Sequence, residues 1–82
     1  MLAEEKIREA AREVVRDMAN VPVQDGDALV SSGLIDSLSI LKLIARLEQK
    51  LGIHIPTDNL QPDDFENIDW IVDTVLRVSP LQ

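Results

Sequence analysis

Apolar residues recur at intervals of three and four along three stretches of the chain, a spacing that predicts amphipathic helices. These stretches cover residues 3–19, a segment from residue 36 or 37 to residue 51, and a last segment that begins after Asn67 and ends at Pro80. Pro62 is well placed in the first turn of a shorter helix that includes Phe65. The pattern therefore predicts an all-α bundle of three long helices and one short one.

A long connection, residues 20–36, separates the first two predicted helices. It contains turn-forming residues such as Pro22, Gly26 and Gly33, with apolar residues among them. A loop of this length inside a small domain is usually functional or is held in place by its own side chains. We therefore expect an ordered loop that covers the helices.

The second predicted helix carries more apolar residues than one buried stripe requires. The face that we expect to be buried consists of positions 40, 43, 44, 47 and 51. Leu38, Leu41 and Ala45 fall on a different face, next to Ser37, because residues three or four apart are neighbours on a helix. This second apolar patch predicts a docking surface.

Three polar residues set the charge of the predicted docking surface, namely Ser39, Lys42 and Arg46. A simpler interpretation is that Lys42 and Arg46 are solvated helix residues without a partner. The sequence leaves both interpretations open.

Composition excludes several classes of function. The chain has 82 residues, enough for one domain (residues 1–82), and it has no cysteine and only one histidine, His54. Disulfides, thiolate metal sites and a histidine-based triad are therefore excluded, and we expect neither an enzyme nor a metal site. The net charge of -7 argues against a nucleic-acid partner. Without an apolar stretch long enough to cross a bilayer, and with a charged N-terminus, we expect a cytoplasmic monomer that does not insert into membranes.

The segment with the most chemical information surrounds a serine at the expected start of the second helix. Its sequence is Gly33-Leu34-Ile35-Asp36-Ser37-Leu38. Unpaired N–H groups and the helix dipole make a helix N-terminus a favourable position for phosphate, so Ser37 could carry a phosphodiester there. Asp36 could hold the serine, or could interact with a metal or a basic residue on a modifying enzyme. Taken alone, however, Asp-Ser-Leu is better explained as an ordinary helix cap.

The order of elements along the chain resembles the phosphopantetheine-binding carrier family, which includes acyl, peptidyl and D-alanyl carrier proteins. The resemblance starts from the motif around Ser37 and continues through the leucine-rich second helix, the turn at residues 51–56, the Phe65 segment and the final helix. It implies an acyl-carrier-type four-helix bundle with a 4′-phosphopantetheine arm attached covalently to Ser37. It also implies that a phosphopantetheinyl transferase installs the arm from coenzyme A, using magnesium, and that cargo is held as a thioester.

The resemblance leaves the cargo and the pathway open. An acyl carrier protein would be served by an acyl- or aminoacyl-loading ligase and a downstream acyltransferase or synthase. Ser39 and Lys42 stand where carriers of fatty acid biosynthesis usually show acids, which favours a specialised lipid, polyketide, peptide or cell-envelope pathway. The alternatives are a peptidyl or D-alanyl carrier, or a helical interaction module that is never modified.

Two further predictions concern the aromatic residues and the histidine. Phe65 and Trp70 are expected to be packing residues, with an exposed edge on Trp70. If both were bulky enough to reduce the space between the helices, short or aminoacyl cargo would be favoured. His54 is expected to face solvent near the end of the second helix, without a catalytic or metal-binding role.

Overall fold

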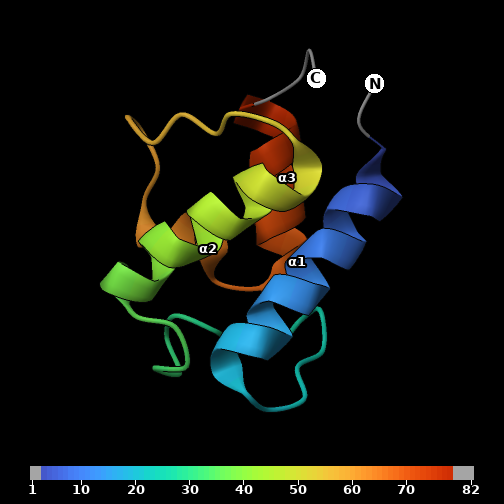
Figure 1. Cartoon of the computed structure of the whole chain (residues 1–82). Coiled ribbons are helices and arrows are strands. Elements are labelled where there is room, and N and C mark those ends of the chain that lie inside the picture. Colours follow the sequence, from blue (N-terminus) through green and yellow to red (C-terminus); the bar gives the residue numbers. More distant parts are fainter. Residues whose placement is uncertain (1–2, 79–82) are drawn as a thin grey trace.

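The computed structural model describes residues 3–78, which form three α-helices and no strand (Figure 1). Helix α1 spans Glu4–Ala19, α2 spans Ser37–Leu51 and α3 spans Ile68–Val78. These bounds agree with the predicted segments to within a residue at the helix starts and at the ends of α1 and α2. Pro80, which was predicted to end the last helix, lies outside the described residues.

The predicted fourth helix is not confirmed as a helix of the bundle. Residues Pro62–Phe65 form η1, a 3-10 helix of four residues. The amide of Gln61 donates a hydrogen bond to Asp64 Oδ2 at 2.8 Å, and the side chain of Asn67 already caps α3 by accepting from the amide of Trp70 at 2.8 Å. So few residues between two caps permit one tight turn and no regular α-helix.

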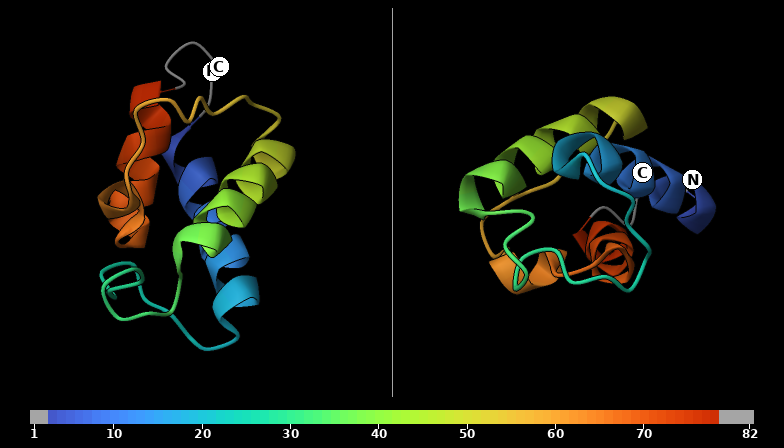
Figure 2. Two further views of the ribbon diagram at one scale, coloured as in Figure 1. Left: turned by 90° about the vertical axis from the view of Figure 1, so that its left-hand side faces the viewer. Right: turned by 90° about the horizontal axis from the view of Figure 1, so that it is seen from below.

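Helix α1 packs against both α2 and α3, and η1 packs against α2 and α3 (Figure 2). The loop between α1 and α2 closes one end of this arrangement, where it runs from the end of α1 to the start of α2 (Figure 1). The side chains that form the core are apolar and come from the helices, η1 and the loops: Ile7, Ala10, Ala11, Val14, Val15, Val23, Leu29, Ile35, Ile40, Leu43, Ile44, Leu47, Ile53, Ile55, Phe65, Ile68, Ile71, Val72 and Val75.

The loop of residues 20–36 is ordered and covers the helices, as its composition predicts. Val23, Leu29 and Ile35 are buried in the core. Backbone bonds also tie the loop to the C-terminal part of the chain, since the Leu29 amide donates to the Glu66 carbonyl at 2.7 Å. The amide of Ile68 donates in turn to the carbonyl of Asp25 at 3.1 Å. The start of α2 is therefore reached from an anchored segment.

The side chain of Asp25 fastens the same loop to α1. One carboxylate oxygen accepts from Arg8 Nη1 at 2.8 Å and from Arg12 Nη2 at 2.7 Å, and the other accepts from Arg12 Nε at 2.9 Å. The hydrogen bond from Arg12, followed by that from Arg8, lowers the pKa of Asp25 from 3.8 to about 2, against an opposing effect of burial. The folded protein therefore favours the ionised carboxylate more strongly than the unfolded chain does.

Asp25→Asn is expected to lower the free energy of unfolding at pH 7 by about 1–2 kcal/mol, because it removes a partly buried charge from two arginines. The depressed pKa means that the contribution is complete above the ordinary pKa of 3.8 and is lost as the pH falls through about 2. The free energies of unfolding of wild type and variant, measured with urea, should therefore converge as the pH falls from 3.8 to about 2. Asp17→Asn, at an exposed carboxylate of α1, is the control and should leave stability unchanged. A difference for Asp25→Asn that stays constant with pH would contradict the interpretation.

Candidate functional site

Ser37 is the first residue of α2, and its side chain is exposed. Within residues 3–78 its hydroxyl group has no hydrogen-bond partner. The residue before it provides the helix cap: Asp36 has an extended backbone, and its Oδ1 accepts from the amide of Ser39 at 2.9 Å. The cap interpretation therefore applies to Asp36 and leaves the oxygen of Ser37 available.

The electrostatics at the start of α2 follow from this cap. The backbone N–H of Ser39 is the main cause that lowers the pKa of Asp36 below its ordinary value. The Ile40 amide donates to the Asp36 carbonyl at 2.9 Å, so the first intrahelical bond is already formed. An anion carried on Ser37 would lie at the positive end of the helix dipole, which is a favourable position for a phosphate.

The turn that leads into the site is fixed by its own residues. Gly33 has a φ of +84°, which favours glycine at this position. Ser32 Oγ donates to the carbonyl of Ala28 at 2.7 Å, and the amide of Ile35 donates to the carbonyl of Leu29 at 2.9 Å. Since Ile35 is buried two residues before Ser37, the serine is held at a fixed place relative to the core.

A small hollow lies directly beside Ser37. Its volume is about 160 Å³. It is lined by residues of α2, of the segment before η1 and of η1 itself, namely Ser37, Ile40, Leu41, Ile44, Thr57, Leu60, Gln61, Pro62 and Phe65. The contribution of residues 57–61 was missed at the sequence level, where only the apolar Leu60 in an otherwise polar stretch could have indicated it.

Only one of the two aromatic residues narrows this hollow. Phe65 is buried and lines it. Trp70 is 49% exposed, in line with the exposed edge that we predicted, but it does not line this hollow, so the idea that it reduces the space for cargo is wrong. The physical reason is its position on α3, where Ile68, Ile71 and Val75 already form the buried side.

The predicted second face of α2 is exposed in the structure. Leu38 and Leu41 are 74% and 58% exposed, which is unusual for side chains of this size. Ala45, Lys42 and Arg46 are also exposed, and Ser39 is half-buried. The opposite face is buried as predicted, except that Leu51 is only partly buried.

The three cations of α2 differ in their surroundings. Lys50 is paired with Glu13 of α1. Lys42 and Arg46 form no salt bridge with any residue in the range 3–78. Two apolar side chains with two unpaired cations therefore lie within three turns of Ser37.

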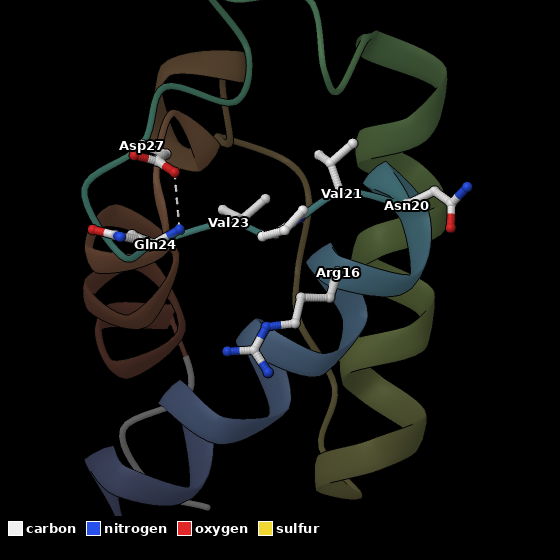
Figure 3. Close-up of a pocket in the computed structure, with 7 residues that line it drawn as sticks. Arg16, Asn20, Val21, Val23, Gln24 and Asp27 are labelled. Carbon is white, nitrogen blue, oxygen red and sulfur yellow. Dashed lines mark hydrogen bonds between the residues drawn. The ribbon is translucent and has the colours of Figure 1, made fainter.

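The hollow at the end of α1 and His54 are not part of this site. A hollow of about 660 Å³ at the end of α1 is lined by Arg16, by residues 20–24 and by Asp27, and it includes no residue predicted for the site. In the view of Figure 3 the loop that carries Val23 and Gln24 passes above the side chain of Arg16, which comes from α1. His54 is exposed, as predicted, and its Nδ1 lies 3.2 Å from Glu48 Oε2.

The described residues provide neither a metal-binding cluster nor a membrane-spanning helix. No group of three or more His, Cys, Asp or Glu side chains among residues 3–78 is arranged to hold a metal ion. In the same part of the chain, no helix is long and apolar enough to cross a membrane.

Comparison with known proteins identifies the family. The family model described as the phosphopantetheine attachment site matches residues 5–75. Acyl carrier proteins from two strains of Tropheryma whipplei, Twist and TW08/27, are each 33% identical to this chain over 63 residues, which cover 73% of the chain and 77% of each relative. No solved structure matches the chain.

The chain therefore belongs to the phosphopantetheine-binding carrier family, in the part of it that includes the acyl carrier proteins. The cofactor of this family is a covalent 4′-phosphopantetheine arm. Carriers of this kind are not enzymes themselves, and they act together with transferases and acyl-handling enzymes.

Proposed function

We propose that this chain is an acyl carrier protein that bears its 4′-phosphopantetheine arm on Ser37 and presents acyl intermediates as thioesters to partner enzymes. One observation carries the proposal: Ser37 is an exposed, unbonded hydroxyl at the first residue of α2, within the range that matches the family. The arm would supply the reactive sulfur that the cysteine-free chain lacks. Tethering would then give the cargo a high effective concentration at each partner's active site.

The cargo is proposed to be short. The hollow beside Ser37 has a volume of about 160 Å³, whereas small-molecule pockets typically measure roughly 300–1,000 Å³. The buried ring of Phe65 closes one side of it. This geometry supports short acyl cargo, with aminoacyl or D-alanyl cargo as the alternative. Ser39 and Lys42, which stand where carriers of fatty acid biosynthesis usually show acids, favour a specialised lipid, polyketide, peptide or cell-envelope pathway.

The proposed partners are a phosphopantetheinyl transferase, a loading ligase and a downstream acyltransferase or synthase. We place their contact on the exposed face of α2, with Leu38, Leu41 and Ala45 as apolar contacts and Ser39, Lys42 and Arg46 as polar ones. The contiguous core of residues 3–78 supports one carrier domain over residues 1–82. We propose that this domain acts as a monomer in the cytoplasm.

The test of the carrier role is the intact mass after incubation with coenzyme A, magnesium and a broad-specificity phosphopantetheinyl transferase. A gain of one phosphopantetheine is expected. If the folded protein gains nothing, and protein isolated from its native host is also unmodified, an unmodified helical interaction module becomes the better description.

The double variant Lys42→Glu/Arg46→Glu is expected to slow loading of the modified protein by its own ligase by on the order of ten-fold, because two unpaired cations at the contact become anions. The measurement is kcat/KM for loading, with protein that already carries the arm. Lys6→Glu/Arg16→Glu reverses two exposed cations of α1 and changes the net charge equally, so it is the matched control. Equal rates for both double variants would remove Lys42 and Arg46 from the contact.

A further inference from the structure

Trp70 is a large aromatic side chain that the core does not use. It is the only tryptophan of the chain, and it is 49% exposed. Helix α3 buries Ile68, Ile71 and Val75 on its inner side, while Trp70 shares the outer side with Asp73 and Arg77, three and seven residues further on. Tryptophans in folded proteins are highly buried on average, so the exposure of this one distinguishes it from a core residue.

Trp70 lines two hollows, and acidic residues are the other lining residues of both. One has a volume of about 230 Å³ and is lined by Asp69, Trp70 and Asp73. The other has a volume of about 440 Å³ and is lined by Asp63, Asp64, Glu66 and Trp70. We call these six residues the Trp70 face. Trp70 is the residue that the two hollows share.

The negative charge of the Trp70 face is only partly neutralised. Asp69 pairs with Arg8 at 2.6 Å, and Asp64 pairs with Arg77 at 3.3 Å. Asp63 and Asp73 are exposed, and their carboxylates have no salt bridge or hydrogen bond within residues 3–78. Two anions therefore remain available beside an exposed ring.

The Glu66 carboxylate is already occupied by hydrogen bonds within the chain. It accepts from the amide of Ser31 at 2.9 Å, and also from the Ser31 hydroxyl group. These hydrogen bonds lower the pKa of Glu66, with the Ser31 hydroxyl as the largest cause. Glu66 thus holds the loop, while Asp63 and Asp73 are free to receive a partner.

We propose that the Trp70 face is a second docking surface, and that its occupant is an arginine-bearing surface of a partner protein. A guanidinium group can stack on an indole ring and donate N–H hydrogen bonds to a neighbouring carboxylate at the same time, which an ammonium group does less well. Asp63 and Asp73, each of which lines a hollow together with Trp70, are the acceptors for such donors. Tryptophan is also among the residues that most often dominate the energy of a protein interface.

This surface is distinct from the α2 face of the proposed function. Its residues belong to η1, to α3 and to the link between them, and none lines the hollow beside Ser37. The charges are also opposite, since the α2 face offers Lys42 and Arg46. A partner surface that complements one face would repel the other, so the two faces are suited to different contacts.

The test uses the Ser37→Ala protein, so that binding is measured without the arm and independently of the proposed function. The probe is a peptide of four arginines alternating with glycine, compared with its lysine counterpart. Trp70 is the only tryptophan and the chain has no tyrosine, so its emission reports binding directly. We expect saturable binding of the arginine peptide at least three-fold tighter than that of the lysine peptide.

Variants distinguish this site from general attraction to an acidic protein, with affinity measured by calorimetry. Trp70→Leu and Asp63→Asn/Asp73→Asn are each expected to weaken binding by three-fold or more. Glu9→Gln/Asp17→Asn removes two exposed carboxylates of α1, and should leave the affinity within two-fold. Equal weakening by both double variants, or equal affinity for both peptides, would overturn the proposal. A concentration-dependent dimer that Trp70→Leu abolishes in sedimentation would also overturn it, by assigning the face to a second copy.

Discussion

Ser37→Ala is expected to abolish the uptake of phosphopantetheine from coenzyme A, so that the mass of the variant stays that of the unmodified chain. The substitution removes the hydroxyl oxygen that would form the phosphodiester. It should leave the fold intact, because this hydroxyl has no hydrogen-bond partner within residues 3–78 and alanine is well suited to a first helical turn. The cap at Asp36 does not involve the Ser37 side chain.

Ser39→Ala is the matched control for this experiment. It removes a hydroxyl group two residues further on, in the same helical turn, while the Ser39 amide still donates to Asp36. Because Ser37 is intact, we expect this variant to be fully modified at the end of the incubation, even where loss of the Ser39 contact slows the transferase. Helix content measured by circular dichroism should be the same for both variants and the wild type. Modification that persists in Ser37→Ala would contradict the proposal and assign the arm to another side chain.

The helices could be predicted because their signals are local. The three- and four-residue spacing of α1 and α2 shows directly which face is buried, and Gly52 ends α2 with a φ of +66°. The last helix was expected to begin after Asn67, and in the structure the side chain of this residue caps α3. The exposure of Leu38 and Leu41 also follows from helical spacing alone.

The features of the fold and the site that could not be predicted depend on contacts between distant parts of the chain. The bonds of Asp25 with Arg8 and Arg12 require α1 and the loop to meet, which no local pattern encodes. The wall that residues 57–61 add to the hollow has the same origin, since it depends on how the segment before η1 passes α2. The idea that Trp70 reduces the space for cargo was wrong because its position on α3 turns the side chain outwards, away from the hollow beside Ser37.

Phe65→Ala is expected to lower the free energy of unfolding by about 3–5 kcal/mol, the range for removal of a buried aromatic side chain. Phe65 is 1% exposed and is one of the largest buried side chains of the core. Domains of this size are stable by only about 5–15 kcal/mol, so a large fraction of the stability would be lost. Urea unfolding followed by circular dichroism measures the change.

Trp70→Ala provides the matched aromatic control, since it removes a still larger side chain only five residues away. We expect it to cost about 1 kcal/mol or less, because the ring is half exposed and leaves no closed cavity behind. If the size of the apolar side chain alone decided the loss of stability, Trp70→Ala would cost more than Phe65→Ala. The comparison therefore separates the effect of burial from that of side-chain size. Similar losses for the two variants would mean that Trp70 packs on the core after all, and would remove the basis for a docking role. The expected difference would instead assign the two aromatic residues separate tasks: Phe65 shapes the interior beside Ser37, and Trp70 remains available at the surface.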